Sequence, residues 1–378
     1  MQSTPIGQVL LRLDPATDAA AGPVSAIALD GGGTLWLGAA ALDGIRRLVP
    51  QGSGAAPAAG NAVPEGSIWG QPRAVDLGAM FELPDPGDPM DLTGMACAGD
   101  RLWFVGSHRG RRLDLDPALS DAQNLNRLSR VEPIHRRACL GHARITATGL
   151  PQPRDLALLP IGDGGNHLTR ALVTDPHLGP SFTPRLGPLA GDARNACDGP
   201  GLAGLAYNAG RLWIGLSAPV LGGFAVLLEI EPREQRRCIL GLQPIGVDGR
   251  PYRKHLVQIN GLGVQALRWH GDSLLILAGG GADGAAGEPG IYELREASKL
   301  RSDSLTLADD PRLGLLLPLA EESTPGGGCP RAMELYDGLG QPGVMVVPGD
   351  PGPTGRGAPA GVVADIYALN GYNDTGIG

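Results

Sequence analysis

Residues 25–38 read SAIALDGGGTLWLG: a short apolar run, a turn rich in glycine and aspartate, and a second run that opens with Leu-Trp. The same pattern returns at residues 93–106 (TGMACAGDRLWFVG) and at residues 203–215 (AGLAYNAGRLWIG). Two short apolar runs joined by such a turn are typical of a β-hairpin. The recurrence of one hairpin along the chain indicates a repeat architecture.

Weaker copies of this unit occur at residues 155–175, 265–277 and 333–347. Four strands of a propeller blade need roughly 40 to 50 residues, and the intervals between copies can hold them. The sequence therefore predicts an all-β fold, a six-bladed β-propeller, with seven blades as the alternative. The residues that mark the second strand of each unit are Trp36, Trp103, Leu172, Trp213, Leu275 and Met345.

The ends of the chain suggest how such a ring closes. An apolar run at residues 8–13 precedes the first unit, and another at residues 364–369 follows the last. If the N-terminal strand completes the last blade, no strand edge is left exposed. We therefore expect one propeller domain over residues 1–378, with blades from about residue 25 to 370 and a flexible tail at residues 371–378.

Composition supports an ordered β fold and excludes some partners. Glycine (60) and proline (34) are abundant, but hydrophobic residues make up 42% of the 378 residues and charged residues only 19%, which argues against disorder. The net charge is −8 and the basic residues are scattered, so the sequence predicts no nucleic-acid and no membrane binding. The five cysteines are too far apart for a zinc pair or a disulfide framework, and no signal peptide is recognisable, so we expect a cytoplasmic protein.

Five motifs in fixed order resemble the bacterial family named domain of unknown function 3616, whose members are predicted β-propellers. They are residues 81–94 (FELPDPGDPMDLTG), 105–109 (VGSHR), 198–206 (DGPGLAGLA), 216–221 (LSAPVL) and 261–267 (GLGVQAL), within a resemblance over roughly residues 25–350. The resemblance implies an acidic residue at the start of several inner strands, where this chain has Thr93, Ala203 and Gln265. A ring of carboxylates that binds a cation in relatives would thus be partly lost here. The resemblance implies the fold and no activity.

The repeat also predicts a functional face. In a propeller, the ends of second strands and the entrances of inner strands lie on one face around the central channel. Histidine, aspartate and arginine would meet there, and arginine offers a planar donor fork that suits an anionic ligand. The predicted ligand-binding residues are Asp91, Ser107, His108, Arg109, Arg154, Asp175, His177 and Arg331, with Ser217 and Asp350 at further strand ends.

Two of these motifs allow two interpretations each. Ser107 and His108 either contact a ligand, with the histidine as a general acid or base, or satisfy backbone groups where a strand ends. Asp175 and His177 either form a carboxylate–imidazole pair for a metal or belong to an Asx turn before Pro176.

Two functions follow from these patterns. The first is a noncatalytic platform that binds a protein partner or a small polar ligand on the channel face. The alternative is a metal-dependent hydrolase of the phytase-like or lactonase-like propeller type, in which Asp91, Asp175 and His177 hold a divalent cation such as calcium. The sequence contains neither a Gly-x-Ser-x-Gly elbow nor a His-Glu-x-x-His motif, which favours the platform.

Overall fold

Antiparallel strands dominate the part of the chain that the computed structural model describes. The described segments are residues 3–14, 22–51, 68–84, 87–113, 115–128, 131–145, 149–182, 200–281, 288–319, 329–349 and 361–369. Asp350 lies outside them. No helix in these segments is long and apolar enough to cross a membrane.

The strands form five four-stranded antiparallel units. The first is β2 (Val24–Leu29), β3 (Leu35–Ala39), β4 (Ile45–Gln51) and β5 (Ile68–Val75). The second is β6 (Leu92–Ala98), β7 (Arg101–Gly106), β10 (Leu140–Arg144) and β11 (Leu156–Leu158). The third is β12 (Gly201–Asn208), β13 (Arg211–Ala218), β14 (Phe224–Ile230) and β17 (Tyr252–Gln258). The fourth is β18 (Leu262–His270), β19 (Ser273–Gly281), β20 (Gly290–Leu294) and β22 (Leu313–Pro318). The fifth is β23 (Ala332–Tyr336), β24 (Gly343–Val347), β25 (Gly361–Ala368) and β1 (Gly7–Arg12).

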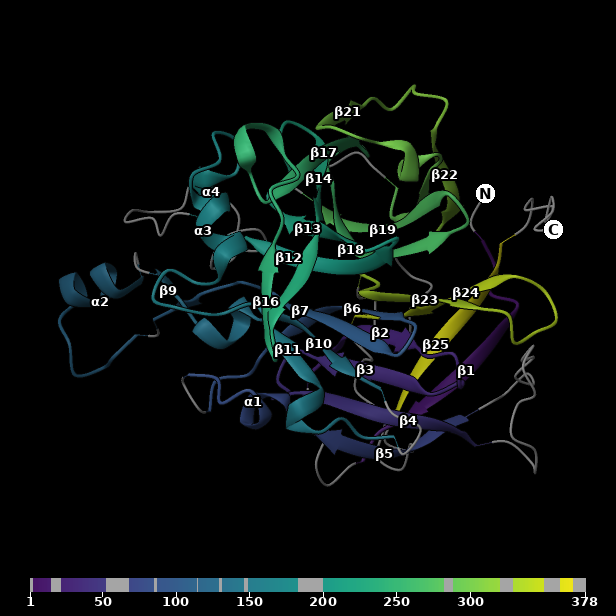
Figure 1. Ribbon diagram of the computed structural model, residues 1–378, viewed down its shortest axis with the longest axis horizontal. Coiled ribbons are helices and arrows are strands. Elements are labelled where there is room, and N and C mark those ends of the chain that lie inside the picture. The colour runs from purple at the N-terminus through teal and green to yellow at the C-terminus, as the bar shows by residue number, and fades with distance from the viewer. Residues whose placement is uncertain are drawn as a thin grey trace.

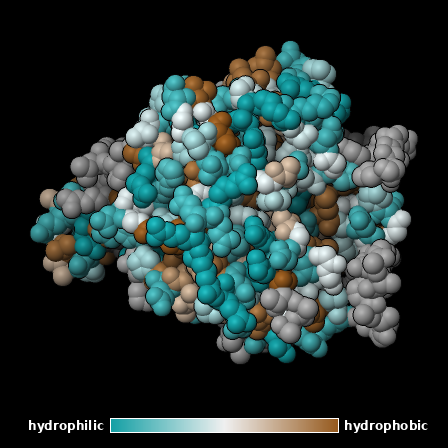
Figure 2. All heavy atoms as spheres, viewed as in Figure 1, coloured by the Kyte–Doolittle hydropathy of each residue, from teal (hydrophilic) through white to brown (hydrophobic). Residues whose placement is uncertain are grey.

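Shorter elements decorate these sheets. The second sheet is extended by β16 (Ile239–Leu242) and β15 (Pro232–Arg236), and the third by β21 (Ser304–Thr306), while β8 (Arg111–Arg112) pairs with β9 (Val131–Glu132). The helices are α1 (Leu77–Met80), α2 (Asp121–Leu128), α3 (His167–Val173) and α4 (Gly179–Phe182). Figure 1 shows β3, β4 and β5 at one end of the molecule, β14, β17 and β21 at the other, and α2 standing out from the body. Hydrophilic residues cover most of the face seen in Figure 2.

The N-terminal strand closes the fifth sheet. Strand β1 pairs antiparallel with β25, with Val9 opposite Ala364. The predicted pairing of the two ends is therefore confirmed. Strand β1 also pairs in parallel with β5, through Leu10 and Ile68, so the first and fifth sheets are joined at their outer edges.

The innermost strands contact one another in a closed order. Strand β2 contacts β6 and β23, β12 contacts β6 and β18, and β18 contacts β23. The described residues thus form a ring of five sheets, and the predicted count of six blades is not confirmed. The predicted unit at residues 155–175 is instead the outer strand β11 followed by α3.

Helix α3 stands where the sequence predicts the second strand of that unit. Asn166 caps its N-terminus by accepting a hydrogen bond from the Thr169 N–H at 2.9 Å. Leu168 and Leu172, four residues apart, are fully buried on one side of the helix. In a short apolar run this spacing is hard to distinguish from that of a strand, and Leu172, the predicted strand marker, lies on the helix.

The tryptophans of the repeat pack between neighbouring sheets. Trp103 of the second sheet stacks on Tyr207 of the third with ring centroids 6.1 Å apart. Trp213 of the third sheet meets Trp269 of the fourth edge-to-face at 5.6 Å. Trp36 of the first sheet is completely buried in a cluster that includes side chains of the second. These contacts bury the large apolar areas that hold adjacent sheets together.

A buried ion pair ties four of the five innermost strands together. The Nε atom of Arg268 on β18 donates to Glu334 Oε1 on β23 at 2.9 Å. The same guanidinium donates to the Leu205 carbonyl on β12 at 3.1 Å and to the Ile27 carbonyl on β2. The Leu29 N–H on β2 donates to Glu334 Oε2 at 3.0 Å. One charged pair therefore cross-links four of the five innermost strands.

Candidate functional site

A cavity of about 230 Å³ lies where the innermost strands begin. Ser25, Thr93, Ala203 and Gln265 lie in the first halves of β2, β6, β12 and β18, and Arg331 directly precedes β23. All five sheets therefore contribute to this cavity, which we call the ring-mouth cavity. Its lining residues are Pro23, Ser25, Ala40, Asp91, Thr93, Arg109, Gly110, Arg137, Ala203, Ser217, Gln265 and Arg331.

Three arginines dominate the charge of the ring-mouth cavity. Arg109 follows β7 and donates from Nη2 to Ser217 Oγ at 2.9 Å. Arg137 lies on a 3₁₀ turn before β10 and donates from Nη1 to the Gly110 carbonyl at 3.2 Å. The Nε atoms of both arginines are buried and have no hydrogen-bond partner among the described residues. A guanidinium has five N–H donors, and each of these two side chains uses one of them in a hydrogen bond to another described residue.

Glycines make room for two of these arginines. A Cβ atom at Gly201 would lie 2.6 Å from Arg109 Nη2, and one at Gly349 would lie 2.9 Å from Arg331 Cγ. Real Cβ atoms do not approach other heavy atoms so closely. The backbone therefore packs directly against both arginine side chains and restricts where they can lie, which favours binding because less freedom is lost when a ligand arrives.

Among the described residues, Asp91 is the one acidic residue that lines the cavity. It precedes β6 with a φ of 46°, in the left-handed region that aspartate tolerates better than most residues. Its carbonyl oxygen accepts a hydrogen bond from the Ser107 N–H at 2.9 Å, which fixes the backbone there. Within the described segments its carboxylate makes neither a hydrogen bond nor an ion pair.

Hydroxyl groups of the innermost strands bond across to the next sheet. Ser25 Oγ donates to the Leu92 carbonyl at 2.6 Å, and Thr93 Oγ1 donates to the Leu202 carbonyl at 2.7 Å. An ionised carboxylate has no proton to donate, so an acidic residue at position 93 could not make this bond. This gives a physical reason why Thr93 stands where the family resemblance implies a carboxylate.

Ser107 and His108 do not line the cavity. Ser107 is fully buried, and its Oγ accepts a hydrogen bond from the Arg109 N–H at 3.2 Å. The His108 ring lies 3.4 Å from the Asn166 side chain, and burial lowers the pKa of His108 to about 4. Ser107 fits the interpretation that it satisfies backbone where a strand ends, whereas the His108 ring contacts a side chain, that of Asn166.

Asp175 and His177 lie away from the ring-mouth cavity, in the segment between α3 and α4. The N–H groups of His177 and Leu178 donate to Asp175 Oδ1 at 2.9 and 3.0 Å, which is the Asx turn. Asp175 Oδ2 also accepts from the Tyr252 hydroxyl at 2.6 Å and from Lys254 Nζ at 2.7 Å. Burial by itself would raise the pKa of Asp175, but the hydrogen bonds from Lys254 and Tyr252 hold it well below its usual value. Asp175 is thus a structural carboxylate.

The three residues predicted to hold a metal do not converge. No group of three histidine, cysteine, aspartate or glutamate side chains in the described part of the chain could hold a metal ion. Asp91 lines the ring-mouth cavity, while Asp175 and His177 do not. Arg154, also predicted as a ligand-binding residue, is exposed on a 3₁₀ turn outside the cavity.

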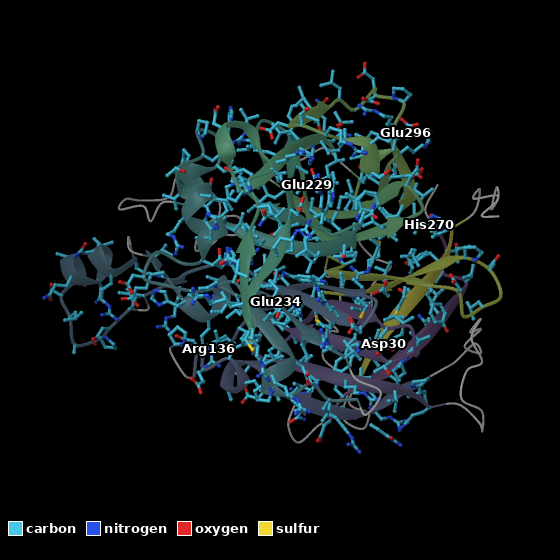
Figure 3. All side chains as sticks on the ribbon, viewed as in Figure 1. Asp30, Arg136, Glu229, Glu234, His270 and Glu296 are labelled. Carbon is cyan, nitrogen blue, oxygen red and sulfur yellow. The ribbon has the colours of Figure 1, made fainter. Side chains whose placement is uncertain are left out.

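A second charged cluster contrasts with the cavity because its carboxylate is paired with arginines. Glu229 on β14, labelled in Figure 3, is almost completely buried and pairs with Arg211 and with Arg253 Nη1 at 3.2 Å. His255 Nε2 lies 3.5 Å from the same carboxylate. Burial would raise the pKa of Glu229, but His255 and the two arginines lower it to about 2. The Glu229 carboxylate is therefore already engaged by side chains of the protein.

Sequence reasoning found Asp91, Arg109 and Arg331, which the ring brings together, and missed Arg137. A protein-family model described as a protein of unknown function, DUF3616, matches residues 23–365. The chain belongs to the DUF3616 family. The match begins just before β2 and ends within β25, so DUF3616 covers the ring-mouth cavity and every innermost strand. The resemblance drawn from the five motifs is thereby confirmed.

No curated protein sequence matches this DUF3616 chain. Solved structures align with it over nearly its whole length at low identity. A streptogramin B lyase is 11% identical over 96% of this chain and 97% of that chain, with a TM-score of 0.31. A PQQ-bound aldose sugar dehydrogenase from Streptomyces coelicolor is 12% identical over 92% and 94%, with a TM-score of 0.37. Virginiamycin B lyase from Staphylococcus aureus is 11% identical over 95% and 98%, with a TM-score of 0.30. Similarities this distant support neither an activity nor a number of blades.

Proposed function

We propose that this DUF3616 protein is a noncatalytic binding protein whose ring-mouth cavity holds a small anion. The observation that carries the proposal is the set of three arginines around one cavity, in which the buried Nε donors of Arg109 and Arg137 have no partner among the described residues. Buried donors without partners are unfavourable, and a carboxylate or phosphate would supply the missing acceptors through charge-assisted hydrogen bonds.

The architecture that supports this site is, in our proposal, a five-bladed β-propeller closed by β1. The closed order of contacts among β2, β6, β12, β18 and β23 supports five blades rather than six. The pairing of β1 with β25 supports closure by the N-terminal strand. A ring of this kind brings residues far apart in sequence, such as Asp91 and Arg331, to one mouth.

A recessed cavity of this size favours a small ligand over a protein partner. Its volume of about 230 Å³ lies below the roughly 300 to 1,000 Å³ of cavities that bind drug-sized molecules. The alternative of a metal-dependent hydrolase gains no support, because its three ligands are divided between the cavity and the Asx turn.

The test is calorimetric titration of the full chain with inorganic phosphate. We expect Arg109→Gln and Arg137→Gln to weaken binding roughly 10- to 100-fold, because each removes a charge-assisted donor worth about 1.5–3 kcal/mol. Arg154→Gln is the matched control, since Arg154 is an arginine outside the cavity, and it should bind like the parent protein. Unchanged affinity in both cavity variants, or no binding by the parent protein at millimolar phosphate, would overturn the proposal.

A further inference from the structure

The ring-mouth cavity contains hydrogen-bond acceptors as well as arginine donors. The protons of Ser25 and Thr93 are committed to carbonyl groups of the neighbouring sheet. Their hydroxyl oxygens can therefore offer only lone pairs to a ligand. The Asp91 carboxylate, without a partner among the described residues, adds two more acceptor oxygens and a negative charge.

This free carboxylate is unusual because three arginines line the same cavity. The ion pairs of the described chain include none between Asp91 and Arg109, Arg137 or Arg331. The cavity thus keeps its positive and negative groups apart instead of neutralising them internally. A ligand that paired with the arginines and with Asp91 at once would need an anionic group for the arginines and a cationic donor for Asp91.

We propose that the ligand is a small phosphate or carboxylate that also carries an amino group, with the anion at the arginines and the ammonium at Asp91. This inference rests on the proposed function. A hydroxyl group could donate to Asp91 but would leave its charge unbalanced, whereas an ammonium forms a charge-assisted pair. The only two lysines of the chain do not line the cavity, so no lysine of this protein supplies that ammonium.

Three matched probes separate the contributions: ethyl phosphate, 2-hydroxyethyl phosphate and 2-aminoethyl phosphate. They share the phosphate and differ in the group that Asp91 would meet. The amino compound carries less net negative charge, so general attraction to a cavity with three arginines and one carboxylate would favour ethyl phosphate. A preference for 2-aminoethyl phosphate therefore reports a local interaction with a negative group.

The experiment is titration of the full chain and of Asp91→Asn with all three probes. Asparagine keeps the size of the side chain and tolerates a positive φ, so the backbone before β6 is preserved. We expect the parent protein to bind 2-aminoethyl phosphate at least about 10-fold more tightly than ethyl phosphate, as one charge-assisted pair implies. In Asp91→Asn that preference should vanish while ethyl phosphate binds as well or better. Asp121→Asn, on the exposed helix α2, is the control and should keep the preference.

The outcomes distinguish this inference from the proposed function. Two results would refute the proposed contact between an amino group and Asp91. They are equal affinity of the parent protein for all three probes, and a preference for 2-aminoethyl phosphate that survives in Asp91→Asn. Either result leaves the proposed anion site intact. Failure of inorganic phosphate and of every probe to bind the parent protein refutes both.

Discussion

The buried pair of Arg268 and Glu334 provides a quantitative test of the closed ring. In Glu334→Gln the shape of the side chain is kept but its charge is lost. Whichever way the amide is turned, its NH₂ group faces a donor, either Arg268 Nε or the Leu29 N–H. Arg268 and Glu334 are each 8% exposed, so the arginine charge remains buried without a counter-charge. Removing one partner of such a pair costs roughly 3–5 kcal/mol.

For 378 residues, an unfolding entropy of about 2.1 cal/mol/K per residue converts this cost into a Tm lower by about 4–6 °C. Scanning calorimetry of the parent protein and of Glu334→Gln measures this difference in Tm. Glu296→Gln is the control, because Glu296 pairs with Lys299 on the surface, and it should leave Tm unchanged. The double variant Arg268→Met with Glu334→Leu should have a higher Tm than Glu334→Gln, since no buried charge is left unpaired. A Tm within about 1 °C of the parent in Glu334→Gln would refute the cross-link.

Three further predictions concern the cavity and the groups beneath it. Gly201→Ala should weaken phosphate binding without unfolding the protein, because its Cβ would displace Arg109; unaltered titration curves would show that Arg109 does not bind the anion. Burial lowers the pKa of His108 to about 4, so between about pH 6.5 and 4 the unfolded chain binds a proton that the folded protein does not. Stability is therefore lost as the pH falls through that window. The Tm of His108→Asn should fall less steeply with falling pH than that of the parent protein, and an identical slope would contradict this. Burial raises the pKa of Cys139 to about 12, so mass spectrometry should find it unalkylated by iodoacetamide at pH 8 in the folded protein, and rapid labelling would show that the site opens.

The sequence predicted the hairpins because their signals are local. Residues 25–38, 93–106 and 203–215 each contain two apolar runs and the turn that joins them, and they form β2–β3, β6–β7 and β12–β13. The prediction of a hairpin at residues 155–175 was wrong because part of this segment is helical. The helix is only seven residues long, too short for the spacing of its apolar residues to distinguish a helix from a strand. The number of blades depends on which innermost strands touch, a long-range property that no single segment carries.

The candidate site was predictable wherever the predicted strands exist, because residues next to strand ends were expected to meet on one face. Asp91 and Arg331 directly precede the innermost strands β6 and β23, Arg109 follows the second strand β7, and all three line the ring-mouth cavity. His177 was wrongly predicted to lie on the channel face, because the predicted strand before it is the helix α3. Arg137 had no signal, since it lies in the segment between β7 and β10 that has no counterpart in the repeat.

A crystal structure grown with 2-aminoethyl phosphate, at a concentration that saturates binding in solution, tests the account most directly. We predict the phosphate within hydrogen-bond distance of Arg109 and Arg137 in the ring-mouth cavity, and the amino group against Asp91. A saturated protein with an empty cavity, or with the compound bound on another surface, would contradict it.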